Sequence, residues 1–155
     1  MSQSFMKLGI DAARRTMDLG IGGPFGAVIV KDGEVIAVAS NHVLGHCDST
    51  AHAEIEAIRK AEQKLGTHDL SGCEIYATGY PCPMCLSAIM WANIKKVYVS
   101  GLPEDAYKIG FRDEPMYKFI QGNMQDKNVL EIVETDRKPA QDLYAEYAQR
   151  NKEIY

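Results

Sequence analysis

Three residues that can bind a metal ion stand in two short motifs of the chain. His52-Ala53-Glu54 lies 27 residues before Pro81-Cys82-Pro83-Met84-Cys85. Two cysteines separated by two residues can reach one metal from a single turn, and a histidine can complete a three-ligand face. Three protein ligands leave a tetrahedral zinc one position for a catalytic water, whose protons Glu54 could handle. The pattern therefore predicts one catalytic zinc per chain, bound by His52, Cys82 and Cys85.

From the sequence alone, two other roles for these side chains stay open. A structural zinc would need a fourth ligand, for which the sequence offers His42, His46 or Cys47. Glu54 would then have no role in the site. A redox pair formed by the two cysteines is the second alternative. The methionine and the prolines around the cysteines, together with the His-x-Glu motif, argue against it.

The length and composition of the chain predict one domain over residues 1–155. A sequence of 155 residues, 46% hydrophobic and 25% charged, is long enough for a packed core and too short for two domains. No apolar run approaches the roughly 18 residues of a membrane span. The start of the chain, Met1–Lys7, lacks the apolar core of a secretory signal. Four cysteines, two of them in metal spacing, suit a reducing cytoplasm better than a disulfide framework.

The charge of the chain argues against a nucleic-acid partner. The net charge is −4 and the isoelectric point is near 5.6, whereas binding to phosphate backbones depends on a basic surface. The basic residues form dispersed pairs, such as Arg14-Arg15 and Lys95-Lys96. We therefore expect a small neutral substrate, with no nucleic-acid or membrane partner.

The apolar periodicity alternates between helix and strand, as in an α/β layer fold. Helices are expected over Ser4–Leu19, Ala51–Leu65, Cys82–Asn93 and Pro139–Lys152. Ser49 and Thr50 are the expected caps of the second helix. Strands are expected at Ala27–Lys31, Glu34–Val38, Ile75–Ala77, Val97–Val99 and Leu130–Glu134, with an Asp32-Gly33 turn between the first two. Both metal motifs then fall at helix N-termini, whose positive ends favour thiolates.

Several segments together resemble the cytidine-deaminase-like superfamily. Those shared across the superfamily are Gly22–Val28, Asp48–Glu54 and Pro81–Cys85. Trp91, Gly110–Asp113 and Lys152–Tyr155 add a likeness to small bacterial guanine deaminases, and the resemblance runs over nearly the whole chain. It implies a three-layer α/β fold of the cytidine-deaminase-like type, with a five-stranded mixed sheet between helices.

The resemblance also implies an activity and a set of site residues. The activity is the zinc-dependent hydrolytic deamination of a purine base, guanine to xanthine and ammonia, with Glu54 as the proton shuttle. Asp113 is expected to carry a second proton while it reads the N–H edge of the base. In this family the C-terminal segment crosses to the neighbouring subunit of a homodimer. The residues expected to line the base pocket are Phe25, Asn41, Trp91, Asp113 and Tyr155.

From the residues alone, these pocket roles have simpler alternatives. Asp113 could cap a helix that begins at Glu114, Trp91 could pack in the core, and Asn41 could be a turn residue after a strand. The chain also departs from the family at Tyr80, where a glutamate or a small polar residue usually precedes the Pro-Cys motif. This departure leaves open which base is preferred.

Three classes of function therefore remain. The first is an aminohydrolase of a free base, with guanine ahead of guanosine, cytosine or another aminated heterocycle. The second is a transfer-RNA adenosine deaminase, against which the acidic charge and the aromatic C-terminus argue. The third is a non-catalytic module stabilised by zinc.

Overall fold

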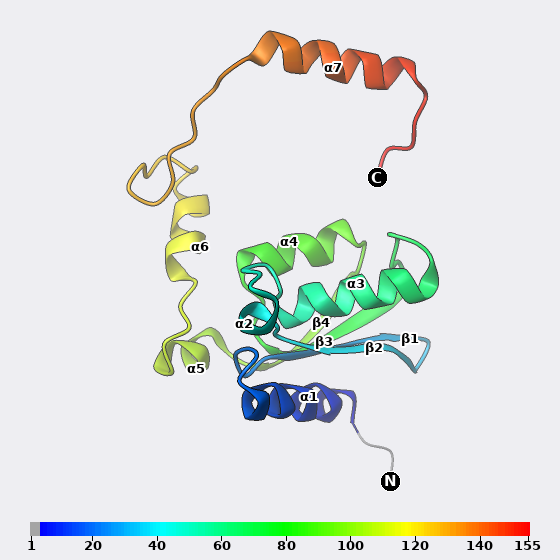
Figure 1. Ribbon diagram of the computed structural model, residues 1–155, viewed down its shortest axis with the longest axis vertical. Coiled ribbons are helices and arrows are strands. Elements are labelled where there is room, and N and C mark those ends of the chain that lie inside the picture. Colours follow the sequence, from blue (N-terminus) through cyan, green and yellow to red (C-terminus); the bar gives the residue numbers. More distant parts are fainter. Residues whose placement is uncertain (1–3) are drawn as a thin grey trace. The chain divides into compact units, whose positions relative to one another are not determined.

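The computed structural model describes residues 4–155 and divides the chain into two compact units, Met1–Glu114 and Pro115–Tyr155. The first unit holds a four-stranded sheet and the helices that pack on it (Figure 1). Its elements, in chain order, are α1 (Phe5–Leu19), β1 (Gly26–Lys31), β2 (Glu34–Ser40), α2 (Val43–His46), α3 (Ala53–Leu65), β3 (Cys73–Gly79), α4 (Pro83–Trp91), β4 (Lys96–Gly101) and α5 (Pro103–Lys108). At the boundary α6 (Glu114–Gln121) begins, and α7 (Arg137–Gln149) follows in the second unit.

The sheet is mixed, as the resemblance implied, with the strand order β2-β1-β3-β4. β1 pairs antiparallel with both β2 and β3, whereas β3 and β4 run parallel. The expected hairpin joins β1 to β2. Asp32 and Gly33 have φ angles of 50° and 78° in its turn, as a two-residue turn of this type requires. Because β3 and β4 run in the same direction, the chain must return between them through a crossover, which is α4.

Helices cover both faces of this sheet, so the first unit is a three-layer α/β structure. α1 lies on one face, and α3 and α4 lie on the other (Figure 1). On the α3–α4 side, strand residues such as Ala27, Ile29 and Ile75 pack with the small residues Ala53 and Ala57 of α3. Because alanine side chains are short, α3 lies close against the sheet, and this dense packing holds its N-terminus in place.

α3 begins later than the sequence predicted, and a different residue precedes it. The helix starts at Ala53 with His52 as its N-cap residue, so the prediction that Ser49 or Thr50 caps it is wrong. Thr50 has another partner, since its backbone N–H and its hydroxyl donate to Asp48 Oδ1 at 2.8 and 2.7 Å. The start of α3 is therefore occupied by a residue that can bind a metal.

The prediction of a fifth strand at Leu130–Glu134 is wrong, because the sheet of the described residues has four strands and this segment is irregular. Its apolar side chains, among them Ile132 and Val133, are exposed. An alternating apolar pattern is only half of what a strand needs, since its backbone groups must also pair with a neighbouring strand. The last predicted helix is present as α7, which starts two residues earlier and ends three residues earlier than expected.

The second unit consists of α6, α7 and the irregular chain around them. No residue of Pro115–Tyr155 is buried, and large apolar side chains such as Ile120 and Leu143 are exposed. The Tyr147 hydroxyl donates to the Glu153 carbonyl at 2.6 Å, which ties the C-terminal residues to α7. Across residues 4–155, no helix is long and apolar enough to span a membrane.

Candidate functional site

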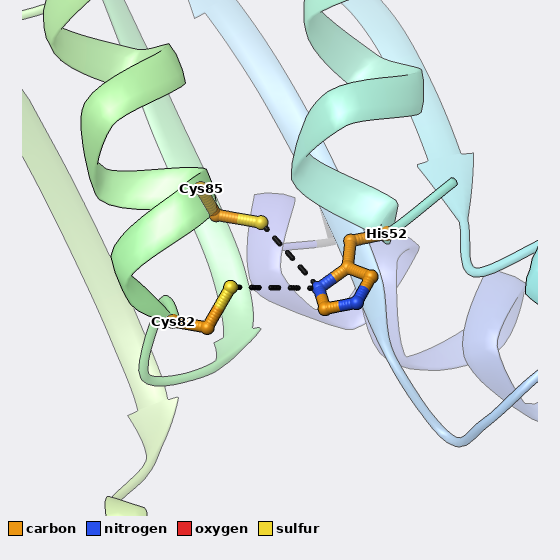
Figure 2. A group of neighbouring side chains, drawn as sticks. All are labelled: His52, Cys82 and Cys85. Carbon is orange, nitrogen blue, oxygen red and sulfur yellow. Dashed lines mark hydrogen bonds between the residues drawn. The ribbon is translucent and has the colours of Figure 1, made fainter. Parts of the chain in front are cut away.

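The three metal-binding side chains predicted from the sequence lie together (Figure 2). His52 Nδ1 lies 3.6 Å from Cys82 Sγ and 3.6 Å from Cys85 Sγ, and the three ligand atoms all lie within 4.8 Å of one another. Zinc bonds of roughly 2.1 Å to nitrogen and 2.3 Å to sulfur, at tetrahedral angles, would place such atoms about 3.6 Å apart. The cluster therefore fits one tetrahedral zinc with little rearrangement.

The N-termini of two helices position this cluster. His52 is the N-cap residue of α3 and Cys82 is the N-cap residue of α4, and neither side chain caps its own helix. Pro83 follows in the first turn of α4, where its missing N–H leaves no bond unmade. Cys85 lies in the same turn and is fully buried. The unpaired N–H groups of both helix starts create a positive potential, which stabilises the thiolate form that binds zinc.

The two thiols have very different affinities for protons. The hydrogen bond from Cys85, with a further one from His52, lowers the pKa of Cys82 to about 4. The bond to Cys82 raises the pKa of Cys85. It is also the hydrogen bond to Cys82 that raises the pKa of His52. The Cys82 thiolate thus has two proton donors beside it, Cys85 and His52. A bound zinc ion would replace these protons as the positive charge that stabilises the thiolate.

Glu54 lies beside the three ligands but not among them. It is 8% exposed, and its Oε2 lies 3.4 Å from Cys85 Sγ. It does not belong to the cluster of ligand atoms that lie within 4.8 Å of one another. Burial raises the pKa of the Glu54 carboxyl, because a charged carboxylate is costly away from water. This carboxyl therefore holds a proton more tightly than an ordinary glutamate does, and its place beside the metal cluster suits it for general acid–base catalysis.

The residues that could have completed a four-ligand structural site have other partners. His42 Nδ1 lies 2.8 Å from the carbonyl oxygen of Ser40, and its ring stacks on that of His46 with the ring centres 4.8 Å apart. Cys47 is exposed, and its Sγ lies 3.9 Å from the carbonyl oxygen of Leu44. In the described part of the chain, no fourth histidine, cysteine or carboxylate joins the metal cluster. The geometry therefore favours a zinc site with an open position.

Asn41 is a buried side chain at the end of β2, where the Gly20–Gly26 turn holds it. Its Oδ1 accepts hydrogen bonds from the backbone N–H groups of Gly23 at 3.3 Å and Val43 at 3.0 Å. Gly22 approaches so closely that a Cβ on it would lie 2.1 Å from the backbone oxygen of Asn41. With the side-chain oxygen engaged, the amide Nδ2 is the end that can donate to a ligand.

Phe25 belongs to this turn, and its ring packs against the end of the strand that leads to the metal-binding cysteines. A Cβ on Gly79, at the end of β3, would meet the Phe25 ring at 3.3 Å. The Phe25 ring also meets the edge of Phe111, with ring centres 5.1 Å apart and an interplanar angle of 88°. Phe111 in turn packs on Gly23, where a Cβ would lie 3.1 Å from its ring. Sequence reasoning assigned no role to Phe111, although it stands in the Gly110–Asp113 segment that carries part of the resemblance.

Asp113 is partly buried and has a specific partner. The hydroxyl of Tyr107 donates to its Oδ1 at 2.8 Å, and this bond raises the pKa of Tyr107 to about 12. The contact of Phe111 with Phe25 brings the segment of Asp113 to the same turn that holds Asn41. Tyr107 was also missed, because a tyrosine six residues before a carboxylate carries no recognisable spacing.

Trp91 and Tyr155 are not brought to the metal cluster by the packing of the first unit. Their exposed fractions are 69% and 81%, so the alternative that Trp91 packs in the core is wrong. Trp91 ends α4, whereas Cys82 precedes that helix, a separation of roughly 13 Å along the helix axis. Tyr155 belongs to the second unit. The pocket roles expected for these two residues stay predictions.

Known proteins share this chain's sequence and fold. A family model, described as the cytidine and deoxycytidylate deaminase zinc-binding region, matches residues 1–101. Guanine deaminase of Bacillus subtilis (strain 168) is 45% identical over 127 residues, which are 82% of this chain and 81% of that protein. An X-ray structure of guanine deaminase from Bacillus subtilis matches with a TM-score of 0.91 and 40% identity, covering 100% of this chain and 99% of that chain.

Two further matches cover less. A guanine deaminase from Nitrosomonas europaea has a TM-score of 0.67 and 32% identity over 72% of this chain and 64% of that chain. A tRNA-specific adenosine deaminase of Aquifex aeolicus (strain VF5) is 45% identical over 98 residues, 63% of this chain and 64% of that protein. The residues of the family model include the metal cluster, Glu54 and all four strands. The chain therefore belongs to the cytidine and deoxycytidylate deaminase family, whose members have a zinc-binding region.

Proposed function

We propose that this protein is a zinc-dependent aminohydrolase that converts guanine and water to xanthine and ammonia. The observation that carries the proposal is the cluster of His52, Cys82 and Cys85, with the buried carboxyl of Glu54 beside it and outside it. Similarity to a guanine deaminase over the length of both chains supports guanine as the base. The likeness to transfer-RNA adenosine deaminases covers less of the chain, and a net charge of −4 disfavours a polyanionic substrate.

In this proposal the protein supplies the positions and the protons for the reaction. His52, Cys82 and Cys85 hold one zinc per chain, which when bound lowers the pKa of a water molecule to about 7. Glu54 takes a proton from the attacking water and delivers it to a ring nitrogen beside C2 of guanine. The raised pKa of this buried carboxyl suits both transfers. The C2 amino group leaves as ammonia, and xanthine remains.

The base pocket is proposed to use the groups around the Gly20–Gly26 turn. Asn41 Nδ2 would donate to an acceptor on the base, because its Oδ1 is already engaged. Asp113 would accept from the N–H edge of the base and carry the second proton to the leaving amine. Phe25 would pack against the ring, which fits a mostly apolar pocket with a few polar groups. Trp91 and Tyr155 would complete the pocket in an assembled protein.

The substrate class is tested by measuring ammonia release from a panel of guanine, guanosine, cytosine, adenine and isocytosine. Guanine is expected to react fastest. A transfer-RNA anticodon stem should yield no inosine, even at low salt, where phosphate-driven binding is strongest. Inosine formation would reject the free-base assignment, whereas preference for another base of the panel would keep the aminohydrolase and change its substrate. Zinc-loaded protein without activity on any of them would leave only the structural module.

We also propose that residues 1–155 form one deaminase domain whose C-terminal segment completes the site of a partner subunit in a homodimer. The support is the surface of the second unit, which buries no residue although it carries many large apolar side chains. Apolar surface of this extent usually marks an interface in a soluble protein. On α4, Met90 and Trp91 are likewise exposed, at 73% and 69%.

Deleting Ile154 and Tyr155 is expected to leave zinc content and folding intact and to cut activity sharply. Closure of a pocket excludes water and strengthens the polar contacts inside it. The test co-expresses the truncated chain with a Glu54→Gln chain, each nearly inactive alone. If the tail acts in the partner's site, random pairing should restore about one quarter of the wild-type activity per chain. Absence of any recovery would show that each tail serves its own subunit.

The cellular location is proposed to be a reducing compartment, the cytoplasm. All four cysteines are free thiols. Two of them lie in the metal cluster, where oxidation would remove the thiolates that bind zinc. A fractionation experiment with the natural host would test this assignment.

A further inference from the structure

The environment of Asp113 contains a side chain that the proposed chemistry has not used. Tyr107, near the end of α5, donates its hydroxyl to Asp113 Oδ1 at 2.8 Å. The guanidinium carbon of Arg112 lies 5.2 Å from the centre of the Tyr107 ring, and Arg112 also pairs with Glu114. The two chain neighbours of Asp113 therefore both have partners. Arg112 lies over the Tyr107 ring, and Glu114 pairs with Arg112.

The backbone between Tyr107 and Phe111 is closed into a tight turn, which fixes this geometry. The N–H of Gly110 donates to the carbonyl of Tyr107 at 3.1 Å, and the N–H of Phe111 donates to that of Ala106 at 3.1 Å. Gly110 has a φ of 101°, a value that residues with a side chain rarely adopt. The chain therefore reverses after α5 and returns Asp113 to the hydroxyl of Tyr107.

Phe111, at the end of this turn, is also held in place by its contacts. Phe111 packs edge-on against Phe25 and lies against Gly23, whose backbone N–H donates to Asn41 Oδ1. Asp113 is thus connected through packed groups to the buried amide of Asn41. The hydroxyl of Tyr107 remains a donor at neutral pH, because the bond to Asp113 raises its pKa to about 12.

We propose that Tyr107 is a positioning residue, which holds one oxygen of the Asp113 carboxylate so that the other faces the base. This inference rests on the proposed function, because it takes Asp113 as a base-binding group. A carboxylate with one oxygen bonded no longer rotates freely about its last torsion, and the remaining oxygen keeps its capacity to accept an N–H. Binding then costs less conformational entropy than it would with a mobile carboxylate.

The experiment separates binding from turnover. Zinc-loaded Glu54→Gln protein can bind the base without converting it, so its dissociation constant for guanine can be measured by calorimetry. Adding Tyr107→Phe removes the hydroxyl and keeps the ring against Arg112. The dissociation constant should rise about two- to tenfold, as expected when binding must immobilise a side chain that was previously held in place. In protein with Glu54 intact, kcat/KM should fall by a similar factor.

Tyr98→Phe serves as the matched control, because it also removes one tyrosine hydroxyl. Tyr98 stacks on Tyr76 with ring centres 4.4 Å apart, and Tyr76 contacts Phe5 of α1. This hydroxyl therefore lies on the sheet face that α1 covers, away from the metal cluster. Its removal should leave both the dissociation constant and kcat/KM unchanged.

A double-mutant cycle distinguishes a positioning role from general support of the fold. In the Asp113→Ala background, Tyr107→Phe should cause no further loss of binding, because its partner is gone. The inference would be overturned if Tyr107→Phe weakened guanine binding equally with and without Asp113, or if it did not weaken binding at all. Unchanged guanine binding in Asp113→Ala, or a Glu54→Gln protein that binds no base of the panel, would overturn it as well. If the wild-type protein binds guanine with this coupling but does not deaminate it, the proposed function fails and the role of Tyr107 stands.

Discussion

Replacing Glu54 by glutamine is expected to remove nearly all deamination while zinc and fold are retained. This carboxyl both takes the proton from the attacking water and delivers it to the ring nitrogen. Since general acid–base catalysis typically contributes 10²–10⁴-fold, kcat should fall by about 10²–10⁴-fold. Zinc should remain bound, because Glu54 lies outside the cluster of ligand atoms. Since burial disfavours the charged carboxylate, the free energy of unfolding at neutral pH should stay the same or rise. Ammonia release, metal analysis and thermal unfolding measure these three quantities.

Glu56→Gln provides the matched control on the same helix. This substitution removes the same charge two residues further along α3, where the mostly buried side chain of Glu56 pairs with the exposed Arg59 at 2.8 Å. Glu56 does not belong to the metal cluster and has Arg59 as its partner, so activity and zinc content should be nearly unchanged. The role assigned to Glu54 would be wrong if Glu54→Gln lost zinc, or if it kept most of its activity.

Replacing Cys85 by alanine is expected to have the largest effect on both metal content and stability. Cys85 is fully buried at the first turn of α4, and its Sγ is one of three ligand atoms. Structural zinc sites with four ligands contribute roughly 10–16 kcal/mol, or on the order of 3 kcal/mol per ligand, so zinc affinity should fall at least about hundredfold. Activity should become undetectable, and the midpoint of thermal unfolding should drop, because zinc connects the starts of α3 and α4.

Cys73→Ala is the control for loss of a buried thiol. Cys73 is 3% exposed on β3 and does not belong to the metal cluster. This variant should lose some stability through the small cavity that it creates, while its zinc content and its kcat stay close to those of the wild type. Full zinc retention in Cys85→Ala, measured by metal analysis after dialysis against a weak chelator, would reject Cys85 as a ligand.

Local patterns in the sequence determined most of the first unit and the centre of its site. Apolar periodicity and the Asp32-Gly33 turn placed four strands and the main helices, because these signals depend on residues that are neighbours along the chain. The spacing of Cys82 and Cys85 predicted a shared metal for the same reason. His52 lies 30 residues before Cys82 and was assigned to the same metal by the combination of the two motifs. The structure brings their ligand atoms together, and the family to which the chain belongs has zinc at this region.

Features that depend on contacts between distant segments were decided only by the tertiary structure. The pattern at Leu130–Glu134 suited a strand, but pairing with a neighbour decides whether a strand forms, and the described sheet has four. His52 rather than Ser49 or Thr50 starts α3, because Thr50 already bonds to Asp48.

The surroundings of the base-binding candidates were likewise set by packing. The sequence assigned no role to Phe111 or Tyr107, and their importance comes from contacts with Phe25 and Asp113. Trp91 stands on the expected helix, yet its exposed position at the far end of α4 follows from the direction in which that helix runs. Sequence spacing thus determined that Cys82 and Cys85 can share one metal, since both lie on a single turn, and the His-x-Glu motif identified His52 as the third ligand. The three-dimensional packing alone decided which side chains surround that metal, because those neighbours come from turns and strands far apart in the chain.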